Sequence, residues 1–418
     1  MPTTAPDGSS PPTEPFSLRR IAVPAFGPSA LASVGAGATL PVVVLGARDL
    51  GASVSVAALV FVVSGLAELV VALPAGGLVA RIGERGALVG AALLEAAAGL
   101  LAWSASGLLA YFAAMVLFGA TSAVFLLARL AYLTDHAPVH LRARAMSTLG
   151  GVHRIGLFVG PFLGAAVVAV WGTRSAFLVA TAASLAAAAV AWRTVELGGA
   201  AAPGASGGPP RPGPSTLEVV RRHRHVLLTV GLGVTVISVA RASRVVLLPL
   251  WAEHVGLSPA QTSLVFGVAG GVEMLLFYPA GSVMDRFGRV WVAVPSVLVL
   301  GVGLLVLPLT SALAGLGAVA VVMGIGNGLS SGIVMTLGAD AAPVEGRTRF
   351  LGVWRLLSLL GNNGGPLVVS AVAGFVGLAA ASLSTGALVV AGAAWLARWL
   401  PGQDPRRAAA AHERVAGG

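Results

Sequence analysis

Apolar segments of about 20 residues, separated by short polar stretches, follow one another along almost the whole chain. A helix rises about 1.5 Å per residue, so a segment of this length spans the hydrocarbon core of a bilayer. Such segments lie at residues 21–46, 54–79, 86–104, 107–132, 145–171, 174–193, 226–251, 259–284, 290–309, 312–337, 350–376 and 378–400. The pattern predicts an all-α membrane protein with twelve transmembrane helices.

The composition supports a bilayer as the surrounding solvent. Of the 418 residues, 56% are hydrophobic and only 10% are charged, and the mean hydropathy is +0.90. An ordinary soluble domain is about one-quarter charged, so this chain lacks the polar residues to cover a soluble surface. The absence of cysteine excludes disulfides, thiolate catalysis and cysteine-based metal sites. The sequence also lacks metal-ligand spacings and nucleophile motifs, so we expect no catalytic residue, metal or cofactor.

The basic residues indicate how the chain is oriented in the membrane. All 26 are arginines, and the net charge is +10. Only Arg48 and Arg174 fall in loops on one side, whereas the opposite side takes the arginines of the even-numbered loops, the central linker and both termini. The positive-inside rule then predicts that both termini lie in the cytoplasm. We therefore expect a multi-pass protein of the inner (cytoplasmic) membrane. The positive charge is therefore a topology signal, and we expect no nucleic-acid partner.

Composition also divides the chain into segments. The first fifteen residues are polar and rich in proline, which is typical of a disordered tail. Residues 198–216 are rich in Gly, Pro and Ser. We expect a cytoplasmic tail at 1–17, a six-helix bundle at 18–195, a cytoplasmic linker at 196–225, a second six-helix bundle at 226–400 and a cytoplasmic tail at 401–418.

The two halves of the sequence match at a single offset of 205 residues. Identical pairs at this offset include Glu68 with Glu273, Pro74 with Pro279, Arg81 with Arg286, Gly83 with Gly288, Asp135 with Asp340, Arg142 with Arg347, Gly156 with Gly361 and Gly160 with Gly365. One offset that persists over four helices indicates two homologous bundles of the same orientation, related by an axis along the membrane normal. Two such bundles enclose a cavity between them, and rocking exposes it to either side in turn.

One loop resembles a signature of the major facilitator superfamily. Gly281, Asp285, Arg286, Gly288 and Arg289 follow the spacing G-x-x-x-D-R-x-G-R between predicted helices 8 and 9. The loop between helices 2 and 3 holds a degraded copy with Arg81 and Gly83, in which Ala80 replaces the acidic residue. The resemblance implies the fold of twelve-helix transporters and a role for the Asp and Arg in latching helix ends. With Ala80 in place of the acidic residue, the resemblance does not extend to a latch in the first half.

Helix 5 resembles a motif of proton-coupled antiporters. Gly156, Gly160, Pro161 and Gly164 form G-x-x-x-G-P-x-x-G, which in this family marks exporters. The alternative is simple close packing, because small residues four apart let helices approach each other. On helix 4, Met115 stands where drug antiporters of the family often carry an arginine.

Ionisable residues in the middle of predicted helices are candidates for function, because each costs about 3 kcal/mol or more in the bilayer unless it is paired or hydrated. They are Glu68, Glu95, Arg129, His153, Arg154, Arg241, Arg244, Glu273 and Arg355. From the family's fold and the depth along each helix we expect a Glu273–Arg154 pair with His153 adjacent, and a weaker Glu68–Arg355 pair. Structural ion pairs that only hold helices together are the alternative for each residue.

Some of these residues suggest what the cavity binds. Arg241 and Arg244 are three residues apart, so they share a helix face, and two cations suit an anionic or zwitterionic substrate or a carboxylate partner. Asn362 and Asn363 provide polar groups for substrate or for interhelical bonds. A coupled proton needs a carboxylate or imidazole. Glu68 and Glu273 are the first candidates, followed by His153 and by Glu95 on a helix that is peripheral in the family.

Together these features favour a secondary transporter that exports a small organic solute by proton antiport. A uniporter, an importer and a non-transporting sensor with the same fold remain alternatives, and a membrane-embedded enzyme fits least well. The expected partners are the solute, protons and the lipid bilayer, and we expect a monomer.

Overall fold

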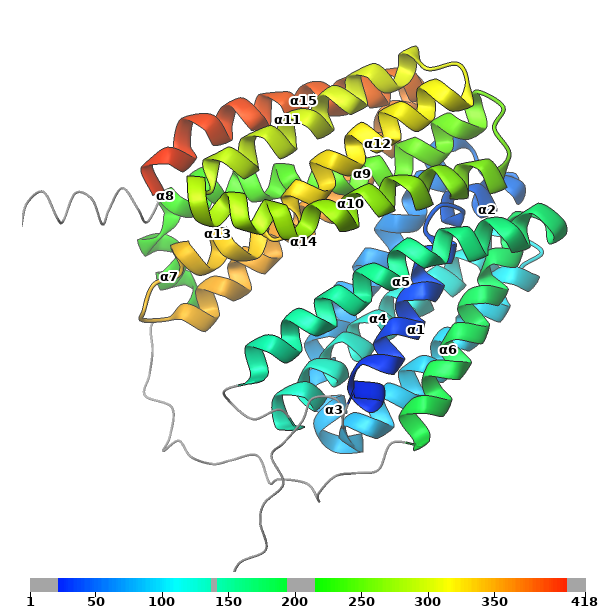
Figure 1. Ribbon diagram of the computed structural model, residues 1–418, viewed down its shortest axis with the longest axis horizontal. Coiled ribbons are helices and arrows are strands. Elements are labelled where there is room, and N and C mark those ends of the chain that lie inside the picture. The colour runs from blue at the N-terminus through cyan, green and yellow to red at the C-terminus, as the bar shows by residue number, and fades with distance from the viewer. Residues whose placement is uncertain (1–21, 137–140, 194–214, 404–418) are drawn as a thin grey trace, which may run out of the picture.

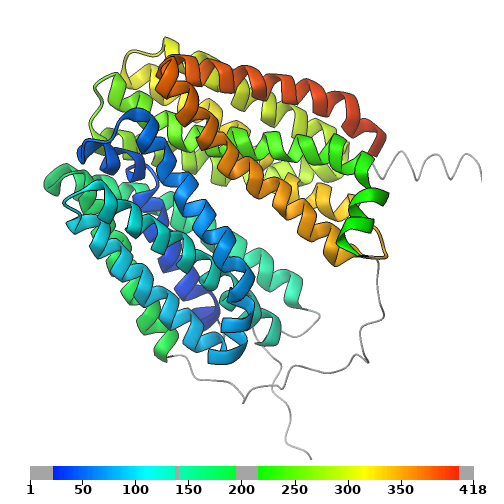
Figure 2. The same cartoon turned by 180° about the vertical axis from the view of Figure 1, so that it is seen from behind.

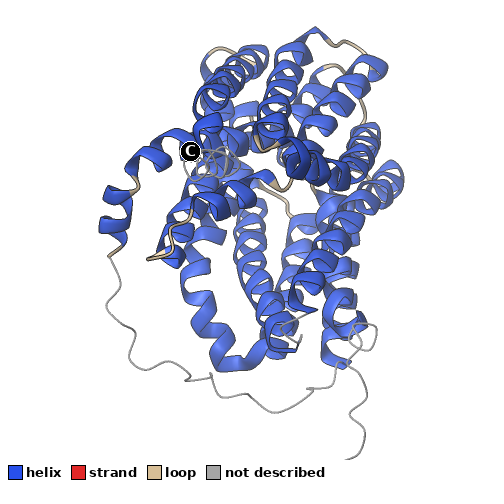
Figure 3. Cartoon of the chain, turned by 60° about the vertical axis from the view of Figure 1, so that its left-hand side comes forward, coloured by secondary structure: helices blue, strands red, loops and turns tan. Residues whose placement is uncertain are grey.

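The computed structural model describes residues 22–136, 141–193 and 215–403, and in these residues the chain forms helices and connecting loops without strands (Figure 3). The predicted tail at 1–17, most of the predicted linker and most of the tail at 401–418 lie outside the described residues. The all-α membrane fold that the hydropathy pattern predicts is confirmed.

The helices of the first half coincide with the predicted spans to within a few residues. They are α1 (Ala22–Thr39), α2 (Val43–Asp49), α3 (Val54–Ser104), α4 (Leu108–His136), α5 (Arg142–Trp171), the short 3₁₀ turn η2 (Thr173–Ser175) and α6 (Ala176–Arg193). The predicted first span is not one helix, because α1 and α2 meet at an angle of 45°. Pro41 lies in the break; it has no amide hydrogen and disfavours helical geometry at the residue before it.

The second half repeats this arrangement. It contains α7 (Thr216–Arg222), α8 (Arg224–Val226), the π-helical turn η3 (Leu227–Gly231), α9 (Leu232–His254), α10 (Pro259–Phe287), α11 (Val290–Val306), η4 (Leu307–Leu309), α12 (Leu313–Ser330), α13 (Ile333–Ala341), α14 (Arg347–Phe375), α15 (Leu378–Trp399) and η5 (Leu400–Gln403). The predicted tenth span is divided into α12 and α13 at Ser331 and Gly332.

The long helix α3 corresponds to two predicted spans. Its 51 residues correspond to about 77 Å of helix, more than twice the thickness of the hydrocarbon core. Gly83 interrupts it with φ 76° and ψ 160°, a backbone conformation outside the helical region that glycine adopts without strain from a Cβ atom. Ten helices have the length and hydropathy of a membrane span, and the α1–α2 pair adds an eleventh. With α3 divided at Gly83, the described residues are consistent with twelve.

The backbone repeats at the same offset as the sequence. Among the described residues, six of the seven glycines with positive φ form pairs 205 residues apart: Gly51 and Gly256, Gly83 and Gly288, and Gly172 and Gly377. The first pair has φ values of 85° and 83°. Each pair marks an equivalent turn between helices, so the two halves share their turn geometry as well as their residues.

The helices form two bundles that meet at one end and diverge at the other (Figures 1 and 2). In Figure 1, α1 to α6 form the lower bundle and α9 to α15 the upper one, and the diverging ends include α7 and α13. The bundles contact each other through α5 against α10 and through α3 against α14. A Cβ atom added at Gly271 of α10 would lie 2.8 Å from the ring of Phe158 of α5, which shows how closely these helices approach.

The glycines of helix 5 pack that helix against α1. A Cβ at Gly156 would lie 2.5 Å from Cβ of Ser33, and one at Gly160 would overlap the carbonyl oxygen of Val34. In the second half, Gly361 and Gly365 approach α9 in the same way, against the residues equivalent to those of α1. The motif therefore provides close helix packing in both bundles.

Candidate functional site

A cavity of about 450 Å³ lies between the two bundles. The first bundle contributes α5 and the residue after α1, and the second contributes α9, α10, α12, α13 and α14. The lining residues are Leu40, Arg154, Leu157, Phe158, Pro161, Ser238, Arg241, Ala242, Arg244, Val245, Phe266, Gly270, Glu273, Met274, Asn327, Ser331, Val334, Met335, Ser358 and Asn362. Several of the intramembrane residues singled out from the sequence therefore share one site.

Three arginines surround one carboxylate in this cavity. Arg244 Nη1 donates a hydrogen bond to Glu273 Oε2 at 3.3 Å, and Arg244 is only 5% exposed. Arg241 lies one helical turn away on α9 and interacts electrostatically with Glu273 and Arg244. Arg154, on the opposite bundle, also interacts with Glu273 and Arg241 over a longer distance. Glu273 is thus surrounded by positive charge from both bundles.

The direct Glu273–Arg154 ion pair expected from the sequence does not form. Arg154 Nη1 instead donates to Ser331 Oγ at 3.0 Å, and its guanidinium carbon lies 3.8 Å from the centre of the Phe277 ring. The ion-pair partner of Glu273 is Arg244, on the neighbouring helix of its own bundle. The two residues of the expected pair do face the same cavity, so the error concerns the partner and not the location.

Glu68 and Arg355 occupy the other contact between the bundles, where α3 packs against α14. They interact electrostatically, but no direct ion pair joins them within the described part of the chain. Glu68 is half-buried and Arg355 is exposed. Asn363 lies at the same contact, against Gly65 of α3, whereas its neighbour Asn362 lines the cavity. Asn362 therefore belongs to the cavity, and Asn363 belongs to the contact between α3 and α14.

His153 takes part in a polar contact that the repeat preserves. Its Nδ1 lies 2.6 Å from Ser33 Oγ, which joins α5 to α1. In the second half, Ser358 Oγ lies 2.9 Å from Ser238 Oγ at the two equivalent positions. His153 thus holds a helix contact of the repeat, beside the cavity and not in its lining.

Arg129 and Glu95 lie outside the cavity lining. Arg129 of α4 is half-buried and interacts electrostatically with His153. Glu95 is half-buried in the second part of α3, next to Ala96, whose carbonyl oxygen accepts a hydrogen bond from Thr181 of α6 at 3.3 Å.

The signature loop positions charged residues at the diverging ends of the bundles. Arg289 Nε donates to Asp340 Oδ2 at 2.8 Å and its Nη2 to Oδ1 at 3.4 Å, so the start of α11 is joined to α13. Gly281 lies on the last turns of α10, and Gly288 ends that helix with φ 99°. Asp285 and Arg286 are exposed. In the degraded copy, Arg81 and Gly83 are also exposed.

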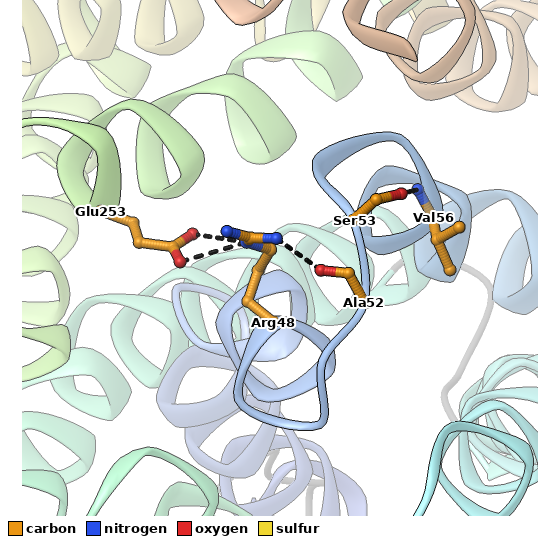
Figure 4. A network of polar contacts seen from close by, with 5 residues as sticks. All are labelled: Arg48, Ala52, Ser53, Val56 and Glu253. Atoms are coloured by element: carbon orange, nitrogen blue, oxygen red, sulfur yellow. Dashed lines mark hydrogen bonds and ion pairs between the residues drawn. The ribbon is translucent and has the colours of Figure 1, made fainter.

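An ion pair closes the converging ends of the bundles, and sequence reasoning had treated its arginine only as a topology signal. Arg48 Nε donates to both carboxylate oxygens of Glu253 at 3.1 Å, and its Nη1 donates to the carbonyl oxygen of Ala52 (Figure 4). Arg48 lies in the last turn of α2 and Glu253 in the last turn of α9, so the pair joins the two bundles. The two residues are 205 positions apart, which is the repeat offset. Two oppositely charged residues at equivalent positions of the two halves are a signal for this contact that the sequence alone contains.

The same ends are joined by further contacts. Ser370 Oγ of α14 donates to the carbonyl oxygen of Ser55 at 2.8 Å, and α2 packs against α9. Glu253 lies nine residues beyond Arg244, about 14 Å along the helix axis. The contacts therefore cover the cavity on one side. In the described residues, no group of three His, Asp or Glu side chains is placed to hold a metal ion.

Comparison with known proteins identifies one family, whose profile matches most of the chain. The sequence profile of the Major Facilitator Superfamily matches residues 26–361 and 230–416. A search of curated protein sequences gives no match.

Similar solved structures include three transporters. A D-xylose-proton symporter has a TM-score of 0.68 and 14% identity, and the alignment covers 91% of this chain and 97% of that one. A POT family transporter in complex with a thioalcohol-conjugated peptide has a TM-score of 0.71 and 12% identity, with coverage of 92% and 96%. A peptide transporter POT in complex with sulfate has a TM-score of 0.73 and 12% identity, with coverage of 92% and 95%. At these identities the likeness concerns the fold.

Proposed function

Because the chain belongs to the Major Facilitator Superfamily, we propose that it is a secondary active transporter that moves a small organic solute by alternating access, coupled to protons. Members of this family are transporters rather than enzymes. The observation that supports the proposal most directly is the charged cavity between two pseudo-equivalent bundles, which are joined by an ion pair at one end.

The contacts on the two sides of the cavity differ in a way that suits alternating access. At the converging ends, the Arg48–Glu253 ion pair and the hydrogen bond from Ser370 to Ser55 cross between the bundles. At the other ends the bundles diverge (Figure 1). The positive-inside rule assigns the diverging ends to the cytoplasm, so this conformation corresponds to an inward-facing state. Both termini then lie in the cytoplasm, and the inner membrane is the proposed location.

Glu273 is the proposed proton-binding residue. Its carboxylate is held by Arg244 inside the cavity, so its protonation breaks an ion pair at the site itself. Glu68, at the equivalent position, lies at the second contact between the bundles and is the next candidate. A residue of this kind couples proton binding to a change of conformation because its charge alters the contacts between helices.

The direction of transport is a separate question. The helix 5 motif favours export by antiport through its resemblance to exporters. The same glycine contacts, however, occur in α14 of the second half, where they pack against α9. Packing therefore accounts for these glycines in either direction, and import and uniport stay as alternatives.

Reconstituted vesicles test the proposal. A pH gradient is imposed across the membrane, candidate organic solutes are added, and proton movement is followed with a pH-sensitive dye. Solute-dependent proton flux is expected for the unmodified protein and is expected to vanish in Glu273→Gln. Glu95→Gln serves as the matched control, because it removes an intramembrane carboxylate outside the cavity lining. Solute flux without proton flux would identify a uniporter, and a lack of both across the panel would favour a sensor.

A further inference from the structure

We infer that the transported solute is an amphipathic organic dianion, bound by the guanidinium groups of Arg154 and Arg241. This inference rests on the proposed transport function and specifies the substrate class of the same cavity. Its basis is the balance of charge in the cavity, the lack of partners for some of its polar groups and the distribution of its apolar wall.

The cavity holds more positive than negative charge. Arg154, Arg241 and Arg244 line it together with a single carboxylate, that of Glu273. The ion pair between Arg244 and Glu273 accounts for one positive and one negative charge, which leaves two arginines without a carboxylate partner. Unneutralised charge within a bilayer is costly, and a ligand with two negative charges removes that cost.

The surplus arginines have free hydrogen-bonding capacity. Arg241 makes no hydrogen bond or ion pair within the part of the chain that the structure describes, although its side chain lines the cavity. Arg154 makes one hydrogen bond, to Ser331, from a group with five donors. The two come from opposite bundles, α9 and α5. A planar guanidinium suits carboxylate, sulfonate or phosphate groups, which accept two parallel hydrogen bonds.

The rest of the cavity suits an organic skeleton rather than a bare inorganic ion. Phe158, Phe266, Met274 and Met335 are among the apolar side chains of the wall. The volume of about 450 Å³ falls within the range of sites for small organic molecules. Asn327 and Asn362 add amide groups at the same cavity, and the Asn327 Oδ1 atom is buried without a partner among the described residues.

The ion pair between Arg244 and Glu273 also determines whether the proton and the solute bind together or exclude each other. The charged groups that face Glu273 are Arg244 and Arg241 of α9 and Arg154 of α5. The other helices packed against α10, which are α11 and α12, carry no ionisable residue. A proton on Glu273 neutralises the carboxylate and releases Arg244, so the surplus rises by one positive charge. Proton and anion therefore bind together, which corresponds to co-transport and opposes the antiport suggested by helix 5.

The test uses a series of ligands that share one ring and differ in fixed charge. The probes are benzene disulfonate, benzenesulfonate, benzenesulfonamide and benzyltrimethylammonium, and the readout is thermal stabilisation and affinity of the purified full-length protein. We expect each added negative charge to tighten binding about tenfold, the equivalent of about 1.4 kcal/mol. The gain for the second charge should be lost in Arg241→Gln and in Arg154→Gln. Arg85→Gln, which removes an arginine outside the cavity, should retain it.

The proton arm uses the same disulfonate, whose charge does not change with pH. Its affinity should rise in acidic buffer, and Glu273→Gln should keep the higher affinity in both acidic and alkaline buffer. The inference is overturned if the neutral or cationic probe binds best, if binding shows no dependence on charge, or if acid weakens anion binding. Anion binding without flux in vesicles would refute transport alone, whereas flux of only neutral or cationic solutes would refute the substrate class alone.

Discussion

The Arg48–Glu253 ion pair should control which side of the cavity is closed, and reversing one of its charges should open that side. In Glu253→Arg, two positive charges face each other between α2 and α9, at the end where the bundles now converge. Glu253 is the better residue to change, because Arg48 also holds the carbonyl oxygen of Ala52 within its own bundle. The expected result is a shift of population towards the state that is open at this end.

The size of the shift follows from the geometry. Two unit charges 3.1 Å apart attract each other by about 1.3 kcal/mol in water, but the side chains are 30% and 37% exposed, so solvent reduces the net value. We take about 1 kcal/mol for the pair, which corresponds to about a fivefold change in population when it is neutralised in Glu253→Gln. Reversal adds repulsion of similar size, so Glu253→Arg should shift the population about thirtyfold.

Distances between spin labels measure this shift, and the absence of cysteine makes labelling specific. Leu109→Cys with Leu313→Cys reports on the converging ends, and Ile82→Cys with Val344→Cys reports on the diverging ends; all four side chains are exposed. The first distance should lengthen and the second shorten in Glu253→Arg. High salt should reduce the effect, because the pair is partly exposed.

Two controls separate gating from loss of charge. Asp340→Asn breaks an ion pair that lies within one bundle, so it should leave the Arg48 end closed. Arg48→Glu combined with Glu253→Arg restores opposite charges and should return most of the population. Unchanged distances in Glu253→Arg, or equal changes in Asp340→Asn, would show that the pair does not control access.

Three further predictions concern packing, substrate binding and a turn. Gly160→Ala places a Cβ atom on the backbone of α1 and should lower the free energy of unfolding by about 1–3 kcal/mol, measured by thermal unfolding, whereas Gly150→Ala points into open space and should change it little. Arg241→Ala should reduce transport more than membrane abundance, compared by flux and immunoblot; an equal loss of both would indicate a structural role. Gly83→Ala should cost about 1–3 kcal/mol because φ is 76° and ψ is 160° there, while the nearby Gly86→Ala should be tolerated; equal melting temperatures for the two variants would contradict this reasoning.

The charge cluster shows what the sequence leaves open about a site. The expectation from helical depth and from the family's fold brought Glu273 and Arg154 together, and both residues line one cavity. It did not predict that Arg244 would be the partner of Glu273. Which of several long arginine side chains reaches a carboxylate depends on the rotation of each helix about its axis and on the distance between bundles. Neither quantity is encoded in residue spacing.

The Arg48–Glu253 pair shows a similar division. The sequence contains both residues at the repeat offset, but equivalent residues meet only if they lie next to the axis that relates the two halves. Asn362 and Asn363 differ for the same kind of reason, since adjacent residues on a helix point about 100° apart and only the packing of α14 decides which one faces the cavity.

The sequence by itself determined the helices, the duplication and the position of each charged residue along its own helix. These follow from hydrophobic burial in the bilayer and from the regular rise of the helix, which act locally along the chain. Only the tertiary structure decided the partner of Glu273, the break between α1 and α2, and the ion pair at the converging ends. Those features depend on how the two bundles are rotated and spaced relative to each other, and contacts between residues far apart in sequence set that arrangement.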